Sequence, residues 1–475
     1  MAEREIQYQS IAQLGGAIRH GELSPLEITE SLLDRIERLD GSLHAIQRLT
    51  RQRALAEAKA AELELGAGHD RGPLHGIPYV AKDLYDVRGE PTAAGCSLLT
   101  NNVAQRDCAV VRRLAQAGMV LLGKTHTAQF AFGAVGINHD TGTPHNPHHA
   151  EAHAPGGSSS GSAVAVSAGL APMGLGSDTG GSVRIPSALC GTVGLKTTVG
   201  RVSRAGIYSL SWTLDSAGPL TRTTEDAALV YQAMQGEDAE DETTWGITPH
   251  DAVGTLRRGI DGIRVAFAET LFFDDVDTEV EELVRATGPV FESLGAHVGH
   301  IELPEATLVM ADESRALMIA AEGCAVNRTL LEKHFDQLDP VVARRMIDGQ
   351  KLMATDYFQV IRRWKQWRTQ VLERLLDLDV LIVPTTMIPA APLRLIDQDL
   401  DSYQRYNFKY MRNTSVGNIL NLCGVSLPCG FSRDGLPVGV LVYAKPFQED
   451  TALRVAYAYE RATQWHQRRP KLPLD

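Results

Sequence analysis

The stretch PGGSSSGSAVAVSAGLAPMGLGSDTGGSVRIP, residues 155–186, holds two serines, Ser158 and Ser182, each preceded by two glycines. A high density of glycine and serine is typical of a flexible linker. Here, however, the polar run passes directly into small apolar residues that favour a helix, and the strand-like PMGLGSD follows. The stretch therefore predicts two glycine-rich turns joined by a helix and a strand.

The rest of the chain shows the alternation of strands and helices that is typical of an α/β protein. Residues 8–66 are predicted to be helical, and a capping box with proline at the first helical position marks a helix start at SPLE, residues 24–27. From about residue 74, short apolar runs such as PYVAK (78–82) and DVLIVPTT (379–386) alternate with helical segments. No internal repeat and no clear linker divides the 475 residues.

Composition excludes several classes of protein. The net charge of −12 comes without a basic stripe, so we expect no nucleic-acid partner. The sequence lacks an apolar run of the roughly 18 residues that span a bilayer, and its start has no apolar core of a signal peptide. We therefore expect a cytoplasmic protein without a membrane partner. The six cysteines form no CxxC pair, which argues against a zinc or disulfide framework.

Two other motifs match patterns of known sites but fail on their context. Residues 118–125, GMVLLGKT, satisfy the phosphate-loop pattern, yet the positions that should form an open loop are apolar and strand-like. Residues 157–161, GSSSG, satisfy the nucleophile-elbow pattern around Ser159. An elbow needs an apolar strand before it, and the preceding HNPHHAEAHAP is polar. We favour neither site.

Histidines before the glycine-rich stretch raise the question of a metal centre: His139, His145, His148, His149 and His153. Their neighbours are mostly proline, asparagine and glycine, without a helix or strand to fix ligand geometry. We expect a solvated loop and no metal.

The combination of motifs closely resembles the amidase signature family, the Ser–cis-Ser–Lys hydrolases. The motifs are GIPYVAKD (76–83), GGSSSGS (156–162) and the long run GSDTGGSVRIPSALCGTVGLKTTVGRVS (176–203). Two positions depart from the family pattern: Ser160 stands where glycine is frequent, and Thr197 stands where proline is usual. The resemblance implies an α/β fold with a central mixed β-sheet flanked by helices on both faces and a helical N-terminal segment.

The resemblance also assigns the catalytic roles. It makes Ser182 the nucleophile, Lys82 the base and Ser158 a proton relay between them, with a cis peptide bond between Gly157 and Ser158. A lysine can act as a base only when neutral, and burial can lower its pKa by roughly 3–5 units. Taken without the resemblance, Lys82 is a strand-end lysine in water and Ser158 is a helix N-cap.

Backbone N–H groups of the DTGGS turn form the expected oxyanion hole: Thr179, Gly180, Gly181 and Ser182. Asp178 and Arg184 flank the nucleophile. They are predicted to hold the loop by pairing, although a surface salt bridge explains them equally well. By resemblance, Ser159 is a secondary hydrogen-bonding residue near the relay.

These assignments imply an amidohydrolase that cleaves a carboxylic amide, or a carbamate or urea-like C–N bond, without a metal or organic cofactor. We expect one catalytic domain over residues 1–475, with a helical part (1–70), a signature core (74–220) and a substrate-shaping part (255–475). A homodimer is a further expectation. The alternatives are a glutaminase-type amidotransferase subunit that needs a partner protein, and a non-catalytic binding scaffold. Five residues could line the pocket or belong to the core: Phe130, Phe132, Trp212, Met318 and Tyr406.

Overall fold

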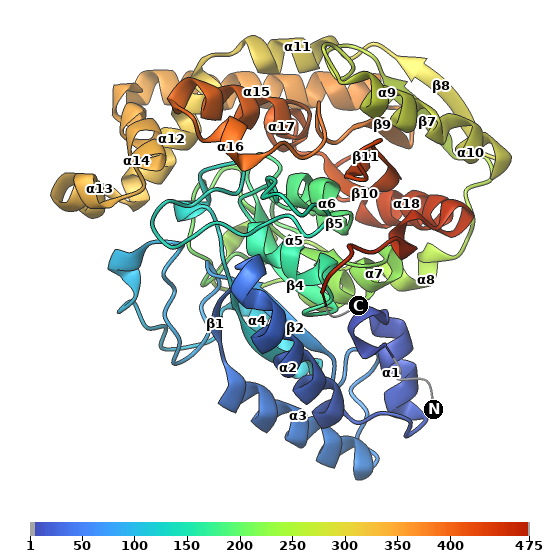
Figure 1. Ribbon diagram of the computed structural model, residues 1–475. Coiled ribbons are helices and arrows are strands. Elements are labelled where there is room, and N and C mark those ends of the chain that lie inside the picture. Colours follow the sequence, from blue (N-terminus) through green and yellow to red (C-terminus); the bar gives the residue numbers. More distant parts are fainter. Residues whose placement is uncertain (1–4, 474–475) are drawn as a thin grey trace.

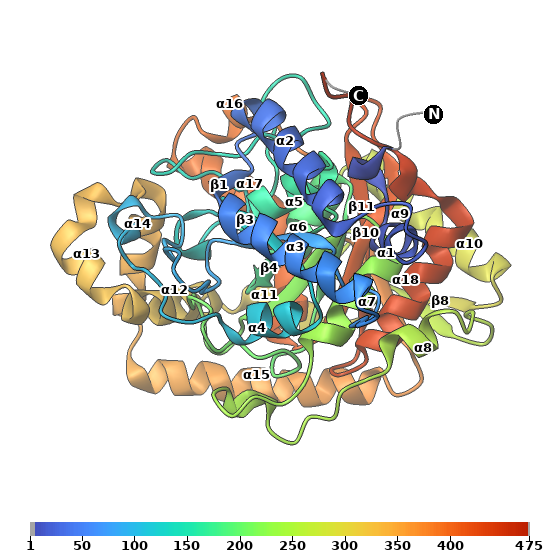
Figure 2. The ribbon, with the colours of Figure 1, turned by 90° about the horizontal axis from the view of Figure 1, so that it is seen from below.

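The computed structural model describes residues 5–473 and is built around one mixed sheet. Within this range, eleven strands follow the order β1-β3-β2-β4-β6-β5-β10-β11-β9-β7-β8. The N-terminal half of the chain supplies β1 (Ile46–Leu49), β2 (Pro78–Lys82), β3 (Val120–Thr125), β4 (Met173–Asp178), β5 (Val193–Lys196) and β6 (Ser216–Thr221). The C-terminal half supplies β7 (Arg264–Ala268), β8 (His297–Ile301), β9 (Val380–Pro384), β10 (Cys423–Phe431) and β11 (Pro437–Ala444). The predicted mixed sheet flanked by helices is confirmed (Figures 1 and 2).

The N-terminal helices follow the sequence signals except at one point. The capping box of Ser24 and Glu27 starts α2 (Pro25–Leu43), which lies between α1 (Ile11–Arg19) and α3 (Arg51–Gly66) along the chain. The prediction that residues 8–66 are helical is wrong at β1. Helix α2 ends because His44 adopts the left-handed region (φ 51°), and the Asp40 carboxylate accepts the N–H of Ala45 at 2.7 Å. The chain then pairs with β3.

The position of strand β3 shows that residues 118–125 do not form a phosphate loop. Three of the four residues that would form an open loop, 120–122, are part of this buried strand, which pairs in parallel with β2, and Met119 directly precedes it. Helix α4 (Ala109–Gln116) precedes it, so the order is helix then strand. A phosphate loop requires the opposite order.

Small residues let the central helix α5 (Ser160–Ser167) lie inside the molecule, and all eight of its residues are buried. A Cβ on Gly161 would overlap the carbonyl of Ala45 and lie 2.6 Å from the backbone nitrogen of His126. The helix packs on β2, β3 and β4. It therefore carries Ser158 and Ser159 into the core at its N-terminal end.

The C-terminal half completes the sheet and adds a helical region between β8 and β9. Strand β10 pairs antiparallel with β5, and this pair joins the two halves. The remaining helices are α6 (Arg184–Cys190), α7 (Thr224–Met234), α8 (Ala252–Leu256), α9 (Thr278–Arg285), α10 (Thr287–Ser293), α11 (Pro304–Ala311), α12 (Ser314–Val326), α13 (Arg328–His334), α14 (Pro340–Ile347), α15 (Ala354–Arg374), α16 (Leu393–Ile396), α17 (Leu400–Ile419) and α18 (Glu449–Thr463). Figures 1 and 2 show α12–α14 together at one end of the molecule.

None of the helices in residues 5–473 is both long enough and apolar enough to cross a membrane. All six cysteines are buried free thiols.

Candidate active site

Lys82 is the last residue of β2 and is completely buried. Its Nζ donates to the hydroxyl oxygens of Ser158 at 2.7 Å and Ser177 at 3.0 Å. Burial lowers the pKa of Lys82 to about 7, although the carboxylates of Asp215 and Asp178 act in the opposite direction. The lysine can therefore be neutral near neutral pH, and the interpretation of Lys82 as a strand-end lysine in water is wrong.

Ser158 follows a cis peptide bond with Gly157, as the resemblance implies. Close packing explains the glycine: a Cβ at position 157 would lie 2.7 Å from the carbonyl oxygen of Gly133 and 2.7 Å from the nitrogen of Gly136. The Gly157 N–H donates to Ala134 O at 2.7 Å. These contacts hold the Ser158 hydroxyl beside Lys82.

Ser182 lies on the turn between β4 and α6, and its exposed fraction is 8%. Its carbonyl oxygen accepts the N–H of Ser159 at 3.2 Å, so the two glycine-rich turns are in direct contact. The Ser159 hydroxyl lies 3.3 Å from both the nitrogen and the carbonyl oxygen of Ser177. Ser159 thus connects the segment that contains Ser158, called the relay segment here (residues 156–162), to strand β4. Among the described residues, no strand directly precedes Ser159, so the GSSSG motif is not a nucleophile elbow.

Asp178 and Arg184 form a buried ion pair that fixes the nucleophile turn. The guanidinium donates to both carboxylate oxygens, at 2.9 and 3.0 Å, and neither side chain is exposed. Arg184 also donates to Asn418 at 2.6 Å and to Tyr443 at 2.7 Å. Although burial alone would raise the pKa of Asp178, Arg184 holds it well below its usual range. The alternative of a surface salt bridge is wrong.

The DTGGS turn differs in one respect from the predicted oxyanion hole. The Gly181 N–H donates to the Asp178 carboxylate at 2.8 Å, so this group is already engaged. Gly181 has φ +129°, and a Cβ there would overlap Thr414. The Thr414 hydroxyl donates to Gly180 O at 2.7 Å and fixes the turn from the other side.

Two residues next to the site escaped the sequence analysis. The hydroxyl of Ser177 is the second acceptor for Lys82. Asp215 accepts the Thr179 hydroxyl at 2.5 Å and the N–H groups of Leu210 and Ser211 at 3.0 Å each. Burial raises the pKa of Asp215. A signal for Asp215 was available, because it begins the motif DSAGPLTRT, which resembles the family pattern.

The histidine-rich segment is less solvated than predicted. His153 is buried, and His139 pairs with Asp339 at 2.8 Å and Asp397 at 2.9 Å, which raises the pKa of His139 to about 9. His145 packs edge-on against His44. The expectation of a solvated loop is therefore only partly right: His139 is exposed, whereas His153 is buried and most of the segment is half-buried.

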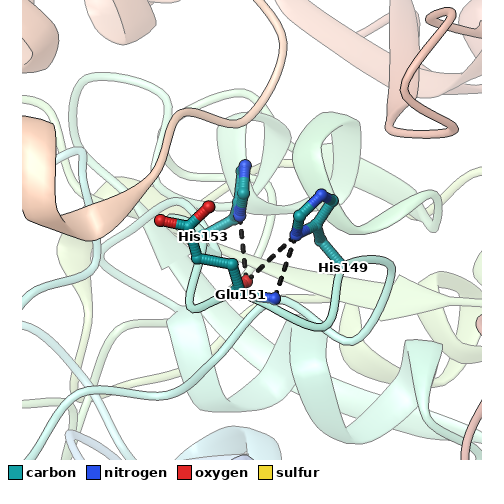
Figure 3. Close-up of side chains that lie close together, drawn as sticks. All are labelled: His149, Glu151 and His153. Carbon is teal, nitrogen blue, oxygen red and sulfur yellow. Dashed lines mark hydrogen bonds between the residues drawn. The ribbon is translucent and has the colours of Figure 1, made fainter.

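Three residues of this segment, His149, Glu151 and His153, offer ligand atoms within 4.8 Å of one another. Their hydrogen bonds do not suit a metal. His149 Nδ1 accepts the N–H of Glu151 at 3.1 Å, and His153 Nδ1 bonds Glu151 O at 2.9 Å. The Glu151 carboxylate points away from His149 (Figure 3) and accepts from Arg394 at 2.6 Å. The segment is better described as a turn closed by its own imidazoles.

A cavity of about 290 Å³ adjoins the nucleophile turn at Thr179. Of the five aromatic and apolar candidates, Phe132 lines this cavity. Phe130 and Met318 are buried in the main core, Tyr406 packs on a smaller core cluster, and Trp212 is 49% exposed beside a second hollow that reaches Ser177.

Comparison with known proteins finds similar sequences and structures among amidases and amidotransferase subunits. The family model described as Amidase matches residues 27–453. A protein named "Amidase" from Pseudomonas putida is 39% identical over 469 residues, which cover 98% of each chain. A glutamyl-tRNA(Gln) amidotransferase subunit from Gloeobacter violaceus is 36% identical and covers 98% of this chain and 99% of its own. The native peptide amidase of Stenotrophomonas maltophilia has 30% identity and a TM-score of 0.87, covering 98% of this chain and 99% of its own.

Proposed function

The chain belongs to the amidase family and hydrolyses the C–N bond of amides, and we propose that it does so through an acyl-enzyme on Ser182. The observation that carries the proposal is the 2.7 Å contact between Lys82 Nζ and the Ser158 hydroxyl in a buried site. A serine hydroxyl needs a base, and a desolvated amine supplies one.

In the acylation step, the Ser182 oxygen attacks the amide carbonyl carbon. The Ser182 proton passes to Ser158, while the proton of Ser158 passes to the neutral Lys82. The Ser177 hydroxyl accepts a hydrogen of the Lys82 amine, which directs the lone pair toward Ser158. The N–H groups of Thr179, Gly180 and Ser182 stabilise the oxyanion, each donor typically contributing about 10²–10³ in rate.

Collapse of this intermediate breaks the C–N bond. Lys82 returns the proton through Ser158 to the leaving amine. Water then attacks the ester of Ser182, with the same relay accepting its proton, and the carboxylic acid leaves. Every proton step uses side chains of this chain, so the proposal requires no metal or organic cofactor.

Substitutions at the three residues test the mechanism against a matched control. Ser182→Ala, Ser158→Ala and Lys82→Ala are each expected to lower kcat on a simple amide by roughly 10⁴-fold or more. Ser160→Ala is the control, because Ser160 is a buried neighbour whose hydroxyl has no hydrogen-bond partner within residues 5–473. It should keep near-normal activity. A serine-directed phosphonate should label the intact enzyme and Ser160→Ala readily. It should label Ser158→Ala and Lys82→Ala far more slowly, because their Ser182 lacks its base, and Ser182→Ala not at all. A fully active Ser182→Ala enzyme would end the proposal.

A second candidate function follows from the relatives named as amidotransferase subunits. In that case the chain would release ammonia from glutamine only when a partner protein is bound. Turnover of simple amides by the purified chain alone supports the stand-alone amidase. Activity confined to glutamine and to a partner complex supports the amidotransferase role.

We also propose that residues 1–475 act as one catalytic domain whose C-terminal part shapes the substrate pocket. The cavity beside Thr179 supports this, because most of its wall comes from residues 310–419. A cytoplasmic location fits the six free thiols. Light scattering of the purified chain tests the expected homodimer.

A further inference from the structure

The cavity beside the nucleophile turn has an apolar wall with an unpaired cation in it. Its apolar lining includes Phe132, Leu214, Met310, Ile319, Phe408 and Met411. Apolar cavities with a few placed polar groups are typical of small-molecule sites. The volume of about 290 Å³ suits an aryl ring or a short alkyl chain.

Contacts on two sides tie the cavity to the reacting centre. On one side, Met411 lies next to the oxyanion turn: a Cβ on Gly180 would be 3.5 Å from the Met411 methyl group. On the other side, Phe132 lies two residues before Ala134, whose carbonyl oxygen holds Gly157 at 2.7 Å. A group bound in the cavity is thus placed between the nucleophile turn and the relay segment.

Arg345, on α14, is the charged residue at the Phe132 side of the cavity. It donates one hydrogen bond to Phe132 O at 3.0 Å, and its guanidinium carbon lies 4.2 Å from the centre of the Phe132 ring. Within residues 5–473, no carboxylate forms an ion pair with Arg345. The Asp339 carboxylate nearby is bonded to His139 and to the start of α14.

The other charges of the wall do not neutralise Arg345. Asp348 pairs with Lys351 at 2.6 Å. Arg315 donates to backbone oxygens at 2.9 and 3.1 Å, and the adjacent Asp312 carboxylate is bound by Arg363 at 3.1 Å. The cavity therefore holds two guanidinium groups and no free acid among the described residues.

A guanidinium has five N–H donors in a planar fork that matches a carboxylate. Arg345 uses one of them within the protein. An unpaired cation next to apolar surface is unfavourable, and a ligand carboxylate would both pair it and keep its donors satisfied. An ammonium group in the same place would face two cations.

We propose that this cavity binds the body of the amide substrate and that Arg345 pairs with a carboxylate carried by that body. The substrate class is then an apolar amide that bears a second, ionised carboxyl group, such as a monoamide of an aromatic or aliphatic dicarboxylic acid. This inference rests on the proposed amidase function. It also disfavours free glutamine, because the cavity offers no acid for the glutamine ammonium group.

Matched pairs of amides test the preference. The aryl pair is 4-carbamoylbenzoate and 4-methylbenzamide, and the aliphatic pair is the monoamide of adipic acid and hexanamide. We expect the carboxylated member to have roughly 10- to 100-fold higher kcat/KM, as a charged hydrogen bond would give. Arg345→Met should remove this preference, mainly through KM, and Arg345→Lys should restore part of it. Arg344→Met is the control, because Arg344 is an exposed neighbour on the same helix.

A binding measurement separates this inference from the proposed function. Calorimetry should detect 4-carbamoylbenzoate binding to Ser182→Ala and at least tenfold weaker binding when Arg345→Met is added. An absence of preference in both pairs overturns the inference. An equal loss for charged and neutral amides in Arg345→Met also overturns it, since Arg345 would then only support Phe132. Unchanged turnover in Ser182→Ala would instead refute the acyl-enzyme.

Discussion

The acidic side of the pH profile should report the ionisation of Lys82. Only the neutral amine can accept the proton of Ser158, and burial lowers the pKa of Lys82 to about 7. The neutral fraction then falls to about one tenth at pH 6 and about one hundredth at pH 5. With the ordinary lysine value of 10.5, the neutral fraction at pH 7 would be roughly a thousandfold smaller. Burial is therefore the main reason why a useful fraction of Lys82 is neutral at pH 7.

Other buried groups titrate in the same range and must be separated from Lys82. The pKa of Asp226 is raised by burial to about 7, that of Glu460 is raised by burial to about 8, and that of Lys196 is lowered by burial to about 8. Asp215 distinguishes them, because its carboxylate raises the pKa of Lys82 and is not among the main influences on the pKa of the other three. Asp215→Asn should move the acidic limb to lower pH by roughly one unit.

The assay is kcat/KM between pH 5 and 9 on 4-methylbenzamide, which has no titrating group in this range. Unfolding midpoints at each pH would confirm that the enzyme stays folded. Asp226→Asn and Glu460→Gln should leave the limb in place, whatever they do to stability. A rate that stays level down to pH 5, or a limb that does not move in Asp215→Asn, would refute the role of Lys82.

Three further outcomes follow from the packing around the site. Arg184→Met leaves the buried Asp178 charge without its partner and should lower the free energy of unfolding by about 3–5 kcal/mol, measured in urea; a change below 1 kcal/mol would mean that the pair is not needed. Gly157→Ala should abolish turnover, because no space exists for the methyl group; normal kcat would contradict the packing. EDTA, His149→Ala and His153→Ala should each leave kcat unchanged, whereas activity lost to EDTA and restored by a metal ion would contradict the metal-free mechanism.

Much of the fold could be predicted because its local signals agree with its tertiary structure. The capping box at Ser24 and the apolar runs at β2, β3 and β9 indicate their elements directly. Strand β1 could not be predicted in this way. Its sequence IQRL has no strand pattern, and its pairing with β3 depends on the turn that Asp40 and His44 create.

Some residues of the site could be predicted from the sequence, and others could not. Lys82, Ser158 and Ser182 belong to motifs, so the resemblance predicts all three as site residues. Ser177 has no motif role of its own, and its importance comes from facing Lys82 across paired strands. Arg345 lies on a helix far along the chain, and only folding brings it to Phe132. Contacts of this kind leave no periodic trace in a sequence.

The seam between β5 and β10 has a consequence for synthesis of the protein. Arg184 donates hydrogen bonds to Asn418 on α17 and to Tyr443 on β11. A nascent chain that has emerged only to residue 400 already holds the Asp178–Arg184 pair, but it lacks Thr414, Asn418 and Tyr443, which hold this pair and the nucleophile turn from the other side. We therefore expect amide cleavage to begin only after β10 and β11 have been synthesised and have added to the sheet at β5.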